Sequence, residues 1–344
     1  GHPGGMIVPA AMALGERVGA TGKLFLEAII VGYEVGLRVG MRMNRNQAQT
    51  FYGSGTWGTL GVAAAASKIL GLKSEQCLNA LGIAQIHTPL ALIMGWIRQR
   101  RPPEVKEGIG WASLTGLASA LLAEKGMIGT FSLHNQDGDE EFIRGLGEDF
   151  EILKLYFKRY PACRWSHPAI DGVLKAKKEH DLKADQIVSI RVCTFSQACN
   201  LDNPRPEIIE QAQYSIPFLI GSALAYGGIG PSEMDEKSLK DPLVLAIADR
   251  VIMELDPQLD ACYPGQTMAR IEIITTSGQR IGISPQSRTR GDFQNPFTLE
   301  EMKEKFRIFA EYCMARQAVE ELLESVLTSE TLENVEQLTR QLVC

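Results

Sequence analysis

The chain of 344 residues is long enough to bury a substantial core, and its length alone suggests two domains. Its 35 Lys and Arg residues against 41 Asp and Glu residues give a formal net charge of -6, which argues against nucleic acid as a partner. Seven cysteines, an odd number without CxxC spacing, argue against a disulfide framework and against a zinc or iron-sulfur site.

The first part of the chain, up to about residue 125, has the apolar spacing of packed helices. In residues 24–43 apolar side chains recur at intervals of three and four, and a face that we expect to be partly exposed carries Glu27, Glu34, Arg38 and Arg42. The other helices predicted here cover residues 59–70, 74–85 and 110–124. This part is therefore predicted to be all-helical.

Between about residues 150 and 290 the pattern changes to a mixture of strands and helices. Residues 186–195 and 268–276 are β-branched and roughly alternating, and a turn at 277–278 leads to a third strand at 280–284. The helices predicted in this region cover residues 166–178, 207–226 and 243–253. The segment is predicted to be a smaller α+β unit.

The chain is helical again from about residue 297. Thr298 and Glu301 have the spacing of a capping box at a helix start, and two more helices are expected before residue 342. We expect this end to pack with the first helical part. The predicted fold is mostly α, with an all-helical domain built from both chain ends (1–152 and 293–344) and an inserted smaller α+β lid domain (153–292).

No apolar run predicts a membrane span. The longest candidate, residues 28–39, contains two charged side chains and is shorter than the about 18 to 20 residues that a bilayer requires. The sequence also lacks the charged and then apolar pattern of a secretory signal. We therefore expect a cytoplasmic protein without a membrane partner.

Familiar nucleotide and metal motifs are incomplete. GATGKL at 19–24 lacks the first glycine of a phosphate loop and has Leu24 where Ser or Thr would bind magnesium. GIGWAS at 108–113 lacks the third glycine of a dinucleotide fingerprint. The five histidines lie far apart and form no HExxH motif, so we expect no metal site.

Four stretches place ionisable side chains beside glycine or proline, where we expect access to a pocket: residues 1–5, 51–60, 96–111 and 157–171. The second leads into a helix whose N-terminal amides could bind a carboxylate. The first three have structural alternatives: a flexible terminus, core aromatics and a solvated charged loop. In the fourth stretch, Cys163 and His167 have the spacing of a nucleophile pair or of metal ligands, but no other residue of the chain completes either kind of site. Recognition of a substrate by the cationic side chains of this stretch fits its composition better.

Six ordered motifs resemble the MmgE/PrpD family, which includes 2-methylcitrate dehydratase, cis-aconitate decarboxylase and iminodisuccinate epimerase. The resemblance covers nearly the whole chain, and it starts at the HPGG motif, after a helical segment that family members usually carry. The motifs are HPGG at 2–5, GTWGTLGVAAAASKILGL at 55–72, GIGWASLTGLASALLAEKG at 108–126, KRYPACRWSHPAID at 158–171, AQYSIPF at 212–218 and NPFTLEEMKEKF at 295–306.

The resemblance implies a helical domain with a smaller α+β lid and an active site between them. It implies a homodimer that works without metal or organic cofactor, and a small polycarboxylic acid as substrate. The expected reaction is removal of a proton α to a carboxylate, as in a hydro-lyase of the 2-methylcitrate dehydratase type. An epimerase or isomerase of the iminodisuccinate type, and a non-catalytic member that only binds a polycarboxylate, are the alternatives.

The same resemblance assigns roles to individual residues. By position in or directly before the motifs, His2, Tyr52, Lys106 and Lys158 are expected to be catalytic. Cys163, Arg164 and His167 are expected to bind substrate. Tyr52 falls where the decarboxylase branch has a histidine and the epimerase branch a tyrosine, and Cys163 falls where the dehydratase and decarboxylase branches have a histidine.

Overall fold

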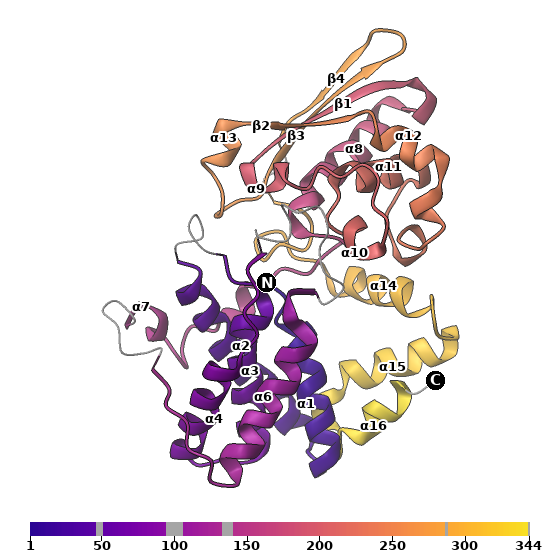
Figure 1. Ribbon diagram of the computed structural model, residues 1–344. Helices are drawn as coiled ribbons and strands as arrows, with labels where there is room; N and C mark the ends of the chain where they lie inside the picture. Colours follow the sequence, from indigo (N-terminus) through magenta and orange to yellow (C-terminus); the bar gives the residue numbers. More distant parts are fainter. Residues whose placement is uncertain (46–50, 94–105, 133–139, 286–287, 343–344) are drawn as a thin grey trace. The chain divides into compact units, whose positions relative to one another are not determined.

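The computed structural model describes residues 1–45, 51–93, 106–132, 140–285 and 288–342 (Figure 1). Helices dominate, with one four-stranded mixed sheet, so the predicted class of mostly α with some β is confirmed. The described residues form two compact units, residues 1–155 with 314–342, and residues 156–313. This division counts α14 (Leu299–Ala310) with the second unit, whereas the boundary expected at 292 would count it with the first. No helix of the described residues is both long and apolar enough to span a membrane.

The first unit consists of helices. Its longer helices are α1 (Gly4–Val18), α2 (Gly22–Met43), α3 (Ser54–Ile69), α4 (Ser74–His87), α6 (Ile109–Glu124) and α15 (Arg316–Leu327). Its short ones are η1 (Lys106–Gly108), α7 (Glu140–Ile143), η2 (Glu151–Lys154), η7 (Ser329–Thr331), α16 (Glu336–Thr339) and η8 (Arg340–Leu342). The helices predicted at 24–43, 74–85 and 110–124 are confirmed. Helix α3 starts five residues before the predicted residue 59, and α1 was not predicted.

Helix α3 is the centre of this unit, in contact with α1, α2, α4 and α6. Nearly all of its residues are buried, because Gly, Ala, Ser and Thr along it let neighbouring backbones come close. A Cβ atom added to Gly61 would lie only 2.6 Å from the carbonyl oxygen of Gly32 on α2. Helix α3 therefore packs closely against its neighbours.

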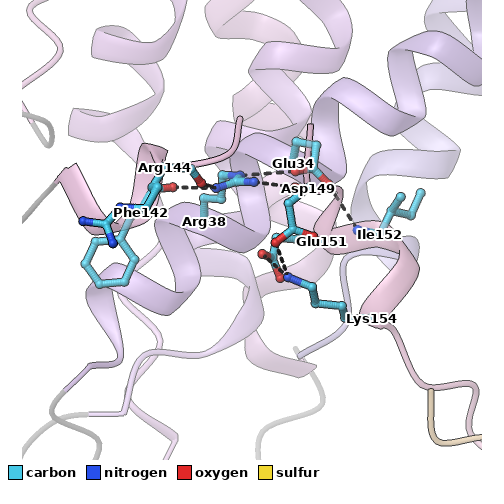
Figure 2. A network of polar contacts seen from close by, with 8 residues as sticks. All are labelled: Glu34, Arg38, Phe142, Arg144, Asp149, Glu151, Ile152 and Lys154. Atoms are coloured by element: carbon cyan, nitrogen blue, oxygen red, sulfur yellow. Dashed lines mark hydrogen bonds and ion pairs between the residues drawn. The ribbon is translucent and has the colours of Figure 1, made fainter. Parts of the chain in front are cut away.

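A buried ion pair on α2 holds the segment that follows α6 and leads into the second unit. Arg38 donates through Nε to Glu34 at 3.2 Å and through its two terminal nitrogens to the carbonyl oxygens of Phe142, Arg144 and Asp149 (Figure 2). Glu34 in turn accepts a 3.1 Å hydrogen bond from the backbone nitrogen of Ile152.

The expectation that Glu34 and Arg38 lie on a partly exposed face is wrong, since they are only 4% and 7% exposed. Burial of the two charges is tolerated because each is paired with the other and because the guanidinium also satisfies three main-chain oxygens. The pair therefore fixes residues 142–152 to α2.

The second unit contains the sheet, in the order β2 (Val251–Leu255), β1 (Ile187–Thr194), β3 (Ala269–Thr275) and β4 (Arg280–Ile283). Strands β1 and β2 are parallel, and the other two pairs are antiparallel. The strands predicted at 186–195, 268–276 and 280–284 are confirmed. Strand β2 was missed, because the predicted helix at 243–253 ends at Ala248 and the β-branched residues that follow it extend the sheet.

Helices α8 (His167–His180) and α11 (Ile216–Tyr226) pack against this sheet, and α12 (Pro242–Ala248) packs on α11. The predicted helix at 207–226 is in fact two, because Ser215 caps the start of α11 and the following proline fits only a first helical turn. The remaining short helices of the unit are η3 (Arg164–Ser166), η4 (Ala184–Gln186), α9 (Ser196–Cys199), α10 (Ile209–Ala212), η5 (Pro231–Glu233), η6 (Ser238–Lys240) and α13 (Pro257–Asp260).

Candidate active site

Tyr52 lies directly before α3, on a stretch of backbone that is held from both sides. Its backbone nitrogen donates to Oδ1 of Asn44 at 2.8 Å, and its carbonyl oxygen accepts from Nδ2 of the same side chain. On the other side Tyr52 forms an antiparallel bridge with Leu92, and Gly53 donates to the carbonyl of Ala91 at 2.7 Å. The partly exposed Tyr52 side chain is thus presented from a fixed position at the start of α3.

Glu107 supplies the cap that α3 lacks in its own sequence. The N-cap residue is Gly53, which has no side chain to accept from the first helical amides. Instead, Oε2 of Glu107 accepts from the backbone nitrogen of Ser54 at 2.9 Å and from the Ser54 hydroxyl at 2.7 Å. A carboxylate at a helix N-terminus is also favoured by the helix dipole.

The backbone at Glu107 adopts an unusual conformation to reach this position. Its φ is 50°, and that of Gly108 is 71°, so two successive residues are left-handed. A left-handed conformation costs a residue with a side chain about 1–3 kcal/mol, and it persists where surrounding contacts impose it. Here the two hydrogen bonds to Ser54 are such contacts.

His2 completes a connected group of three side chains, which we call the His2 cluster: His2, Ser54 and Glu107. The backbone nitrogen of His2 donates to the Ser54 hydroxyl oxygen at 2.9 Å, and its Nδ1 lies 3.0 Å from the same oxygen. The Nδ1 atom is also 3.4 Å from Oε1 of Glu107. The reading of residues 1–5 as a flexible terminus is therefore wrong for His2, which is tied to the start of α3.

Glu107 is ionised at neutral pH although it is buried. Burial alone would raise the pKa of its carboxyl, but the hydrogen bond and charge of His2 and the hydrogen bonds from Ser54 outweigh burial and hold this pKa well below its usual range. The His2 cluster therefore combines a fixed negative charge with an imidazole.

Lys106, another expected catalytic residue, is the partly buried first residue of η1, next to Glu107. Helix η1 lies against the first turn of α3, so closely that a Cβ atom on Gly55 would meet the carbonyl oxygen of Glu107 at 2.2 Å. Only glycine fits this contact. The candidate site in the first unit is thus built around the start of α3.

We expect Gly55→Ala to destabilise the first unit by about 1–3 kcal/mol, the usual cost of overpacking, because Glu107 and Gly108 must move. Urea unfolding measures the change. Gly110→Ala is the matched control, since it lies at the same place in the first turn of α6 and its added Cβ meets nothing within 4 Å. Equal stability of both variants would contradict the close contact.

The other four expected residues lie in the second unit, in the loop before α8 and at its start. The loop is anchored by backbone hydrogen bonds of 2.8 Å from Phe157 to Gly291 and from Cys163 to Gln213. Lys158 and Cys163 are both partly buried.

Arg164 is engaged within the protein. Its guanidinium lies 2.5 Å from Asp292, donates to the Thr267 hydroxyl at 3.0 Å and stacks 4.5 Å from the centre of the Tyr156 ring. These contacts join three separate segments of the second unit. They favour a structural role for this side chain beside the substrate-binding role that the resemblance implies.

His167 is the fully buried first residue of α8 and packs edge-on against Tyr160, with 5.2 Å between the ring centres. Burial, followed by the charges of Lys158 and Arg164, lowers the pKa of His167 to about 3, so its ring is neutral at neutral pH. Its Nε2 has no hydrogen-bond partner among the residues that the structure describes. A substrate-binding role for His167 stays a prediction.

The structure thus brings the expected residues together in two groups. His2, Tyr52 and Lys106 surround the start of α3 in the first unit. Lys158, Cys163, Arg164 and His167 share one loop and helix start in the second unit. Within the described part of the chain, no three His, Cys, Asp or Glu side chains are placed to hold a metal ion.

Sequence reasoning missed Ser54 and Glu107. Glu107 lies in the charged stretch 96–111, for which a solvated loop is the structural alternative, and nothing in the sequence marks it as buried. The one available signal is that α3 has glycine where a capping side chain is usual, which implies that its amides are satisfied from elsewhere.

Comparison with known proteins gives matches along most of the chain. Models described as the MmgE/PrpD N-terminal domain and the MmgE/PrpD C-terminal domain match residues 1–152 and 160–330. The chain is 26% identical to cis-aconitate decarboxylase of Homo sapiens, over 98% of this chain and 73% of that protein. It is 27% identical to cis-aconitate decarboxylase of Mus musculus (99% and 73%) and 22% identical to that of Aspergillus terreus (100% and 76%).

Proposed function

Because the chain belongs to the MmgE/PrpD family, we propose that it is an enzyme that forms and then consumes a carbanion next to a carboxylate of a small polycarboxylic acid. The observation that carries this proposal is the His2 cluster, in which an imidazole is held beside an ionised buried carboxylate at the start of α3. The arrangement suits proton transfer, and Tyr52 and Lys106 lie on the neighbouring backbone.

Removing a proton α to a carboxylate is difficult because it adds negative charge to a group that is already anionic. His2 or Tyr52 acts as the general base, which contributes about 10² to 10⁴-fold when it lies within hydrogen-bond reach of the proton. The ammonium groups of Lys106 and Lys158 stabilise the developing charge. Cys163, Arg164 and His167 are proposed to help to bind the acid.

The fate of the carbanion decides the reaction. Loss of a hydroxyl from the neighbouring carbon gives dehydration, and we propose this hydro-lyase reaction, of the 2-methylcitrate dehydratase type, as the main activity. The relatives named above carry the name of a different lyase, a decarboxylase, at 22–27% identity. Tyr52 favours the alternative of an epimerase, since the resemblance puts tyrosine in that branch.

A panel of citrate-like acids incubated with the protein in D₂O tests the proposal. An alkene product formed with loss of water supports the hydro-lyase, and release of CO₂ would replace it with a decarboxylase. Deuterium incorporated at the α-carbon without elimination would indicate the epimerase. If no acid of the panel exchanges or reacts while the protein still binds one of them, the chain is a binding protein and the enzymatic proposal is lost.

We also propose that the protein is a homodimer that uses an apolar stripe on α6. This helix carries no charged residue from 109 to 123, and Trp111, Leu114 and Leu122 on one face are 59%, 57% and 45% exposed. Exposed apolar patches of this kind favour association.

We expect Trp111→Glu to give a monomer in sedimentation velocity. Leu153→Glu, which changes an exposed apolar residue on another element, should leave the dimer intact. A wild-type monomer would contradict the proposal.

A further inference from the structure

The hydrogen bonds of the His2 cluster decide which nitrogen of His2 carries the proton. The hydroxyl of Ser54 has a single hydrogen, and this hydrogen points to the ionised Glu107, which can only accept. The contact of 3.0 Å between Nδ1 of His2 and the same hydroxyl oxygen therefore needs a hydrogen on Nδ1. The neutral ring then has its lone pair on Nε2.

We propose that Glu107, together with Ser54, is a positioning residue that keeps Nδ1 of His2 protonated and so makes Nε2 the proton acceptor of the reaction. This inference rests on the proposed function and adds a residue that the family resemblance did not assign. Glu107 does not need to touch the substrate, because it acts on the far side of the imidazole ring.

The proton balance of the step is simple. The C–H bond at the α-carbon breaks, its electron pair stays on carbon, and the proton moves to Nε2 of His2. The ring becomes an imidazolium, and its new charge is stabilised by the carboxylate of Glu107, 3.4 Å from Nδ1. The proton later leaves Nε2 for the product or the departing group, and the cluster returns to its first state.

Other ionisable groups lie on the described elements next to His2. Lys106 adjoins Glu107 on η1, and Tyr52 precedes α3. The hydroxyl of Tyr33, on α2, lies beside Gly4 of α1, where an added Cβ would meet it at 2.8 Å, and burial raises the pKa of this phenol. Glu107 is therefore the ionised carboxylate that contacts His2 among the residues described.

The test is an NMR titration of protein labelled with ¹³C and ¹⁵N in histidine, with the His2 signals identified by their loss in His2→Gln. In the wild type we expect the Nδ1–H tautomer. In Glu107→Gln the amide oxygen must face the Ser54 amide and hydroxyl, so its NH₂ faces His2 and makes Nδ1 an acceptor. We expect the Nε2–H tautomer there, and a His2 pKa lower by about one unit or more.

Turnover gives the second readout. Glu107→Gln should lower kcat about 10²-fold with little change in KM and should shift the acid limb of the pH profile to lower pH, because the imidazolium has lost its counter-charge. Glu107→Asp, which keeps the charge, should restore part of the loss. A purely structural role would lower stability without moving the tautomer or the pKa.

Glu34→Gln is the matched control, because it also neutralises a buried carboxylate of the first unit but leaves the His2 cluster intact. It should lower stability and leave the His2 tautomer and pKa as in the wild type. Observation of the Nε2–H tautomer of His2 in the wild type would overturn the inference. The same holds if the tautomer and the pKa of His2 are unchanged in Glu107→Gln. Since the NMR readout needs no substrate, a lack of turnover counts against the proposed function and not against this inference.

Discussion

Replacing Lys158 by alanine and Tyr52 by phenylalanine should each lower turnover at least about 10²-fold, the low end of what an acid-base or charge-stabilising group contributes. The first change removes the ammonium group that is proposed to oppose the negative charge of the carbanion. The second removes the only ionisable atom of a side chain whose backbone is fixed at the start of α3. Steady-state kinetics on the acid identified in the D₂O panel measure both effects.

Two controls separate catalysis from folding. Lys178→Ala removes an exposed lysine of α8, and Tyr312→Phe removes an exposed phenol; both should keep wild-type turnover. The thermal midpoints of Lys158→Ala and Tyr52→Phe should stay near that of the wild type, because both side chains are only partly buried. Wild-type turnover in both test variants would remove the proposed mechanism.

The largest loss of stability is expected from Arg38→Ala. Removing the guanidinium leaves Glu34 as a buried charge without its partner and withdraws the donor from the carbonyl oxygens of Phe142, Arg144 and Asp149. Breaking a buried pair in this way costs about 3–5 kcal/mol. Since alanine is the best helix former, the loss cannot come from the propensity of α2. Denaturant unfolding followed by circular dichroism gives the free energy of unfolding.

Lys154→Ala is the comparison for this measurement. Lys154 also makes two ion pairs in Figure 2, with Asp149 at 2.8 Å and Glu151 at 2.9 Å, but its side chain is exposed to solvent. Exposed pairs contribute little, so this variant should unfold close to the wild type. If Arg38→Ala and Lys154→Ala unfold alike, the buried network does not hold residues 142–152 as described.

The arrangement of helices and strands could be predicted where it depends on local pattern. Helix α2 and strands β1, β3 and β4 follow from apolar periodicity and β-branched alternation. Strand β2 could not be separated from the helix before it, because a short apolar run fits either structure until its neighbour is known. Here the neighbour is β1, about 60 residues earlier, which pairs with β2 in parallel.

The burial of charged side chains could not be predicted from the sequence. Glu34 and Arg38 interrupt an apolar pattern in the same way as an exposed face would, and the main-chain groups that they also bond lie more than 100 residues later. Glu107 lies in a run of charged residues, and it is buried because its carboxylate accepts a hydrogen bond from the first amide of α3, which has no capping side chain of its own. In both cases the deciding contact is long-range, whereas periodicity reports only which residues share a face.

Arg38 holds residues 142–149 through hydrogen bonds to main-chain oxygens, which every amino acid possesses. The side chains of Phe142, Arg144 and Asp149 can therefore be exchanged without loosening the guanidinium, provided the backbone path is kept. An engineer could use these three positions, for example to attach a probe, while Gly145 and Gly147, whose φ values are 72° and 87°, are kept.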